Sequence, residues 1–167
     1  MKRVKSFINK YYLEIAVFLF ALTFSFWLMF STFSYNDGSI LIASKVWSDF
    51  ASHIPLIRSF SFGENFPPQY PIFPGEPIRY HYLFYLLVGL LEKSGLRIDY
   101  ALNIPSALSF ALLIFAIFYL GKVIFKSKAV GLLSVLFFLF NGSFSFIEFF
   151  KNHPLSLSTI NNITTNT

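Results

Sequence analysis

The sequence predicts an all-α integral membrane protein with three transmembrane helices, or four if a shorter apolar segment also crosses the bilayer. Of the 167 residues, 55% are hydrophobic and only 13% are charged, with a mean hydropathy of +0.61. The 24 phenylalanines and 9 tyrosines exceed what the small interior of such a chain would hide from water. Long uncharged runs approach the ~20 residues that a helix needs to cross a bilayer. An ordinary soluble domain is therefore excluded.

The first run occupies residues 15–33, and the preceding residues 1–14 are rich in lysine and arginine. The positive-inside rule places this N-terminus in the cytoplasm and the chain in the cell membrane, inner or plasma, as a multi-pass protein. A cleaved signal peptide is the competing interpretation. The run exceeds a usual signal-peptide core and no small-x-small cleavage site follows it, so a retained signal anchor is favoured.

Two further runs, at residues 104–121 and 129–147, are also predicted to span the membrane. The short basic segment 122–128 between them is expected to form a cytoplasmic loop. Residues 148–167 end in a polar stretch without a core-forming pattern, and we expect them to form an external tail. Residues 34–103 then form a long external loop that carries short interfacial helices.

The segment at residues 80–92 decides this topology. Its apolar part, Tyr82 to Leu91, would extend only about 15 Å as a helix, half of a hydrocarbon core. If it spans, the basic residues of short segments divide almost evenly between the two sides of the membrane. If it lies on the surface, only Lys151 falls outside, against seven basic residues inside (Lys2, Arg3, Lys5, Lys10, Lys122, Lys126 and Lys128). Three spans with an external interfacial helix are preferred, and a short second span is the alternative.

Cysteine content and charge remove several classes of function. The chain contains no cysteine, which excludes disulfide frameworks, thiolate metal sites and cysteine nucleophiles. Its net charge of +5 comes from small basic clusters at the ends of apolar runs, where membrane orientation explains them. Nucleic acid is therefore not an expected partner.

Asp49 and His53 are the first candidate pair for chemistry. They are four residues apart, so on a helix they would share one face. A carboxylate and an imidazole placed in this way can deprotonate a hydroxyl, position a phosphate or share a divalent metal. The alternative is structural, with an aspartate that caps a short helix and a histidine that hydrogen-bonds to it, and spacing alone favours this alternative.

Arg79 and His81 form a second candidate pair, which follows a stretch at 66–77 made semi-rigid by its prolines. Arginine at headgroup depth can donate two hydrogen bonds to a lipid phosphate, or it can simply anchor the chain at the membrane surface. Glu148 ends the last apolar run and, with three spans, lies on the same side as Asp49. A carboxylate at a helix end is otherwise most often only solvated.

Several further segments follow one another in a characteristic order. They are Glu76-Pro77-Ile78-Arg79-Tyr80-His81-Tyr82, then Arg97, Asn103-Ile104-Pro105-Ser106-Ala107-Leu108, Tyr119-Leu120-Gly121-Lys122, Phe125-Lys126 and Ala129-Val130-Gly131-Leu132-Leu133. Together with the signal anchor and the early acid of the loop, this order resembles the N-terminal part of the multi-spanning C-type glycosyltransferases. These include the protein mannosyltransferases and the aminoarabinose transferases of lipid A. The resemblance covers roughly residues 11–150.

The resemblance implies an inverting transfer of a sugar from a polyprenyl-phosphate donor to an acceptor at the external face. Asp49 would then be the general base or an acceptor-positioning carboxylate, and Glu148 a second positioning or metal-binding carboxylate. Arg79 would contact the donor phosphate. In this chain, however, residues 76–78 replace the Lys-Pro-Pro-Leu that is common before the aromatic helix.

His53 and His81 have no role assigned by the resemblance and are retained as substrate-binding candidates. Some members of the family use a divalent metal and others do not, so the resemblance names no certain cofactor. Family members usually have more spans than are found here. We therefore expect a fragment or half of a split transferase, whose partners are a polyprenyl-phosphate sugar lipid, membrane lipids and the remaining half.

A small non-catalytic membrane scaffold or assembly subunit is the rival interpretation. An aromatic, proline-rich external loop would also suit contact with a partner protein. A channel or transporter subunit is disfavoured, because none of the predicted spanning runs carries an internal charge.

Overall fold

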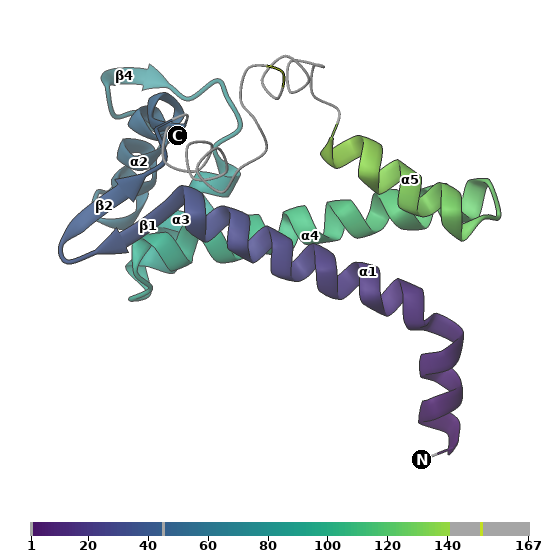
Figure 1. Ribbon diagram of the computed structural model, residues 1–167. Helices are drawn as coiled ribbons and strands as arrows, with labels where there is room; N and C mark the ends of the chain where they lie inside the picture. The colour runs from purple at the N-terminus through teal and green to yellow at the C-terminus, as the bar shows by residue number, and fades with distance from the viewer. Residues whose placement is uncertain (1, 45, 141–150, 152–167) are drawn as a thin grey trace. The chain divides into compact units, whose positions relative to one another are not determined.

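The computed structural model describes residues 2–44, 46–140 and 151 (Figure 1). These residues divide into two compact units. One contains the residues up to Ala21 together with those from Ala111 onward, and the other contains Leu22–Phe110. Helices α1 and α4 each contribute to both units, and each unit is described below by itself.

Helix α1 extends over Lys2–Thr32 and is interrupted at Tyr11, whose φ of −117° and ψ of 18° are not helical. The part after this kink, Tyr11–Thr32, contains 22 residues and is long and apolar enough to cross a membrane. Large side chains such as Leu19 and Trp27 are more than half exposed on it. Apolar exposure of this kind matches a lipid environment.

In the first unit, the beginning of α1 lies against the end of α4 (Ile98–Ile124). Glu14 contacts Lys122, and the ring of Phe18 meets that of Phe115 edge-on at a centroid distance of 5.5 Å. Because the residue number rises along one helix as it falls along the other, the two helices run antiparallel here.

Helix α5, Lys128–Leu139, also belongs to the first unit. Ser127 caps it, since its side-chain oxygen accepts a hydrogen bond from the amide of Val130. Gly131 packs close to α4, where an added Cβ would lie 2.7 Å from the carbonyl oxygen of Phe118. The absence of a side chain at this position therefore sets the close approach of α5 and α4.

In the second unit, α1 leads directly into a β-hairpin. Strands β1 (Phe33–Asn36) and β2 (Ser39–Ile42) pair antiparallel around a turn at Asp37 and Gly38, both with positive φ. Aspartate followed by glycine is the sequence typical of such a tight hairpin turn. The buried amide of Asn103 on α4 donates a 2.7 Å hydrogen bond to the carbonyl oxygen of Phe33.

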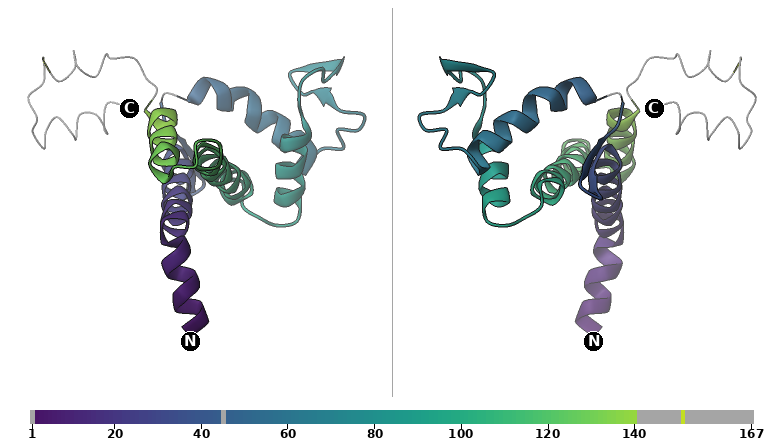
Figure 2. Two further views of the ribbon diagram at one scale, coloured as in Figure 1. Left: turned by 90° about the vertical axis from the view of Figure 1, so that its right-hand side faces the viewer. Right: turned by 90° about the vertical axis from the view of Figure 1, so that its left-hand side faces the viewer.

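Helix α2 (Trp47–Ser61) follows, and a second hairpin connects it to α3 (Leu83–Lys93) (Figure 2). This hairpin pairs β3 (Gln69–Tyr70) with β4 (Phe73–Pro77). The side chain of Asn65 holds its base, donating to the carbonyl oxygen of Gln69 and accepting from the amide of Gln69, both at 2.9 Å.

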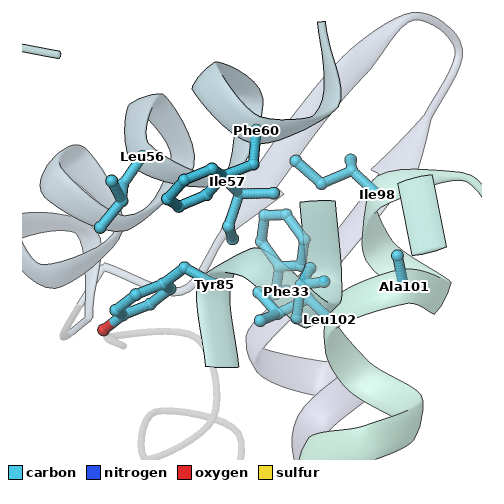
Figure 3. Packing of buried hydrophobic residues seen from close by; sticks show 9 residues of the cluster. Phe33, Leu56, Ile57, Phe60, Tyr85, Ile98, Ala101 and Leu102 are labelled. Carbon is cyan, nitrogen blue, oxygen red and sulfur yellow. The ribbon is translucent and has the colours of Figure 1, made fainter. Parts of the chain in front are cut away.

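The core of the second unit lies between α2 and α3. Ile57 and Phe60 of α2 face Tyr85 of α3, and Phe33 and Leu102 close the cluster (Figure 3). Gly89 of α3 touches α2, because a Cβ there would lie 2.7 Å from the Cβ of Phe60. One face of α3 is therefore buried against protein, while Leu83, Leu87 and Leu90 of the same helix are exposed.

The predicted predominance of helix is confirmed, but the prediction of an all-α chain was incomplete. Alternating side chains and turn residues produce two short hairpins within residues 33–77. In the described residues, α1 and α4 are the two helices long and apolar enough to span a membrane. The third predicted span, 129–147, corresponds to α5 only as far as Leu139, and most of the remainder lies outside the described residues.

Candidate functional site

The predicted pair Asp49 and His53 lies on α2, one turn apart. Asp49 is exposed in the first turn, and His53 is half-buried. The N-cap of α2 is Val46, without a side-chain hydrogen bond, so Asp49 does not cap the helix. The backbone carbonyl oxygen of Asp49 accepts a 2.9 Å hydrogen bond from the hydroxyl of Ser52. Its carboxylate therefore stays open to solvent or substrate.

The structure brings His81 to the same place. The ring of Tyr85, on α3, lies 5.0 Å from that of His53 and 6.4 Å from that of His81. His81 precedes α3 directly and also contacts the ring of Tyr80 at 3.7 Å. Packing of α3 on α2 thus gathers two histidines and an aspartate from separate parts of the sequence.

Tyr85 is the member of this cluster that the sequence interpretation missed as a site residue. In the sequence it is one of several aromatic residues in the segment 80–92 that is predicted to form an interfacial helix. The available signal was its spacing, because Tyr85 is four residues after His81. Its ring is buried in the α2/α3 core while its hydroxyl points away from that core (Figure 3).

The electrostatics of the cluster keep His53 and Tyr85 neutral near pH 7. Burial lowers the pKa of His53 below its ordinary value of 6.5; Asp49 opposes this shift, and His81 adds to it. Burial also raises the pKa of Tyr85 above 10.0, helped by Tyr80 and Asp49. A neutral imidazole can accept a proton, and a neutral phenol can donate a hydrogen bond.

The other two predicted site residues, Arg79 and Glu148, are not part of this cluster in the described residues. Arg79 is exposed in the connection between β4 and α3, two residues before His81, and no described contact joins its side chain to the cluster. Glu148 lies outside the described residues. The structure therefore brings together three of the five predicted site residues: Asp49, His53 and His81.

Two other arginines surround a cavity of about 480 Å³ in the same unit. Arg58 pairs with Glu92 at 3.2 Å, and Arg97 donates to both carboxylate oxygens of Asp99 at 2.7 Å. Lys93 also lines this cavity. The sequence interpretation used Arg58 and Lys93 only to count charge, and it used Arg97 for that count and as one of the segments of the family resemblance.

Across residues 2–44, 46–140 and 151, no group of three or more histidine, cysteine or acidic side chains could hold a metal ion. Asp49 with the two histidines therefore does not form a recognisable metal centre. The arrangement suits proton transfer and hydrogen bonding to a hydroxyl-bearing molecule.

In the described residues, α1 and α4 are apolar helices of membrane-spanning length, and a segment with two hairpins and two short helices connects them. The family model described as "Uncharacterized membrane protein (DUF2298)" matches residues 2–164, and the chain belongs to this family. That description agrees with the predicted membrane location and names no activity. No curated protein and no solved structure matches the chain.

Proposed function

We propose that this chain is the membrane module of a glycosyltransferase that moves a sugar from a polyprenyl-phosphate donor to an acceptor at the external membrane face. The observation that carries the proposal is the meeting of Asp49, His53, His81 and Tyr85 at one place beside a membrane span. The resemblance to the C-type glycosyltransferases supplies the substrate class. Membership of a membrane protein family is consistent with a lipid-linked donor.

In the proposed reaction, Asp49 removes the proton from an acceptor hydroxyl as its oxygen attacks the anomeric carbon. The bond between that carbon and the phosphate oxygen breaks, and polyprenyl phosphate leaves with the bonding electrons. His53, neutral at pH 7, lies one turn from Asp49 and can relay the proton to solvent. His81 and Tyr85 would hydrogen-bond the sugar.

Arg79 is the proposed contact to the donor phosphate, because it precedes His81 closely and its guanidinium is exposed. An exposed guanidinium can donate two parallel hydrogen bonds to phosphate oxygens. Glu148 remains the proposed second carboxylate. The external position of this site follows from the positive-inside rule applied to residues 1–14.

The antiparallel arrangement of α1 and α4 in the first unit supports the proposed topology. Lys122 contacts Glu14, so the end of α4 lies on the same side as the start of the first span. A single external segment between the two spans requires this arrangement. An additional crossing at α3 would place Lys122 on the opposite side.

The test uses the full chain in proteoliposomes with a panel of polyprenyl-phosphate hexoses and pentoses. Release of polyprenyl phosphate is measured, since every donor yields that product. Asp49→Asn is expected to slow release by at least about a hundredfold, the usual contribution of a general base.

Asp37→Asn is the matched control. Asp37 is exposed in the β1–β2 turn at a φ of 47°, which asparagine also adopts readily, so release should not change. Unaltered release by Asp49→Asn would contradict the proposal.

A non-catalytic scaffold remains the second candidate, and the β3–β4 hairpin is the observation that favours it. Phe66, Ile72 and Phe73 are each more than half exposed there. An exposed apolar tip of this kind suits contact with a partner protein or a lipid surface. The scaffold predicts no sugar transfer and a silent Asp49→Asn variant, so the same experiment separates the two functions.

A further inference from the structure

Glu14 is a charged residue inside the first membrane-spanning helix. The sequence interpretation began its run at Ile15, but the span in the structure begins at Tyr11 and includes Glu14. The side chain of Glu14 is only 9% exposed. Ionisable residues in such a position are costly to bury and therefore usually mark a function.

Only one of the two carboxylate oxygens of Glu14 makes polar contacts in the described residues. Its Oε1 accepts a hydrogen bond from the Nζ of Lys122 at 2.7 Å and pairs with the Nζ of Lys128 at 3.6 Å. Its Oε2 is buried and has no hydrogen-bond partner in the described part of the chain. Rotation about the last side-chain torsion exchanges the two equivalent oxygens, so one acceptor position stays unused.

The two lysines have hydrogen-bond donors and positive charge available to bind an anion. Each ammonium carries three donors, and each also lies over an aromatic ring, Lys122 over Tyr119 at 5.5 Å and Lys128 over Tyr12 at 5.3 Å. Two cations and one carboxylate leave a local charge of about +1. A singly charged anion with its own hydrogen-bond donor would complement this group.

A cavity of about 400 Å³ extends along the helices from two of these three charged residues. Glu14 and Lys122 line it, followed by the apolar side chains of Ile15, Phe18 and Phe115. The cavity is thus charged at one end and apolar along the rest of its length. This polarity complements a phospholipid, whose charged headgroup would lie at the charged end and whose acyl chain would lie along the apolar part.

We infer that this site, which we call the Glu14 site, binds an anionic phospholipid whose headgroup carries a hydroxyl, such as phosphatidylglycerol. Lys122 and Lys128 hold the phosphate, the headgroup hydroxyl donates to Glu14, and an acyl chain lies against Phe18 and Phe115. The site lies in the first unit and is independent of the proposed sugar transfer.

The test offers the purified full chain in detergent an equimolar set of lipids with identical acyl chains and measures retained lipid by native mass spectrometry. Phosphatidylglycerol should be retained several-fold over phosphatidylcholine, which is zwitterionic, and about tenfold over phosphatidylmethanol, which has the same charge but no hydroxyl. Equal retention of phosphatidylglycerol and phosphatidylcholine would overturn the site. Equal retention of the two anionic lipids would overturn the role of Glu14.

Variants distinguish the contributions of the two lysines and of Glu14 to lipid binding. Lys122→Gln with Lys128→Gln should abolish the preference for phosphatidylglycerol over phosphatidylcholine, while the control Lys126→Gln, on the exposed connection between α4 and α5, should not. Glu14→Ala should leave anionic lipid bound and remove the preference for phosphatidylglycerol over phosphatidylmethanol. This ratio is internal to each sample, so partial unfolding does not alter it. An unchanged preference in the double lysine variant would refute the inference.

Discussion

His53 illustrates how one residue acquires its properties from its surroundings. Its ring packs against that of Tyr85, and burial lowers its pKa, while the charge of Asp49 one turn away opposes this shift. The unfolded chain therefore binds a proton at His53 before the folded chain does as pH falls. The stability that depends on neutral His53 is therefore complete above its unfolded pKa of 6.5, and it is lost as the pH falls below 6.5 and through the lower pKa of the folded chain.

Neighbouring substitutions should move the pKa of His53 in opposite directions. Asp49→Asn removes a negative charge that favours the protonated imidazole, so the pKa should fall further. His81→Gln removes a group that lowers it, so the pKa should rise. Nuclear magnetic resonance titration of the labelled imidazole measures both shifts. Movement of both variants in the same direction would show that the described cluster does not form.

At the scale of elements, the close packing of α2 on α3 depends on Gly89. The position it occupies leaves no room for a side chain, since a Cβ would lie 2.7 Å from the Cβ of Phe60 and 2.9 Å from the carbonyl oxygen of Ile57. The contact also holds His53 near Tyr85. A change at Gly89 should therefore affect both stability and the candidate site.

Gly89→Ala is expected to lower the free energy of unfolding by about 1–3 kcal/mol, because the two helices must separate to admit the methyl group. A denaturant titration in detergent micelles measures this change. Leu90→Ala is the control on the same helix: Leu90 is 51% exposed, and its loss should cost about 0.5 kcal/mol or less. Equal stability of Gly89→Ala and the wild type would refute this account of the packing.

A second contact between elements joins α4 to the first hairpin. Asn103 is buried, and its amide donates to the carbonyl oxygen of Phe33. A buried carbonyl without a partner is costly, so this side chain stabilises the point at which the chain leaves α1. In the sequence interpretation, Asn103 was only the last residue of a loop and part of a family resemblance.

At the scale of the whole molecule, the sequence leaves open whether residues 80–92 cross the membrane. Helix α3 contains only 11 residues, and its face with Tyr85, Val88, Gly89 and Glu92 is buried. Glu92 accepts a hydrogen bond from Ser61 at 2.7 Å and pairs with Arg58. The short length of α3 and the pairing of buried Glu92 with partly exposed Arg58 support the external interfacial helix that we propose.

Cysteine labelling tests this topology, since the natural chain has no cysteine. Ser44→Cys and Ser94→Cys should react with an impermeant maleimide from the same side, and Ser127→Cys from the other. The reason is that α4 alone would then separate Ser94 from Ser127. If α3 spans instead, Ser44 and Ser127 react from the same side, and that result would overturn the three-span topology.

Much of the fold could be predicted from the sequence, because membrane insertion depends on the length and polarity of local runs. The first run and the one from residue 104 correspond to α1 and α4, although α4 begins earlier, at Ile98. Its first turn carries Asp99, which lies before the predicted run. Paired with Arg97, this carboxylate is accommodated within the helix.

The candidate site could be predicted only in part. Spacing placed Asp49 and His53 on one helical face, but it could not bring His81 and Tyr85 to them, because that contact depends on how α2 packs against α3. Glu14 was missed for a related reason. A carboxylate beside an apolar run looks like the end of a span until its lysine partners are seen.

The sequence by itself determined the membrane class of this protein, two of its long apolar helices and the polar segment that holds the candidate site. These features follow from composition and local periodicity, which need no tertiary contact. Tertiary structure alone decided that His81 and Tyr85 lie beside Asp49 and His53, and that Glu14 pairs with Lys122 and Lys128. Both groups join residues distant in the chain, and only packing between helices selects which of them meet.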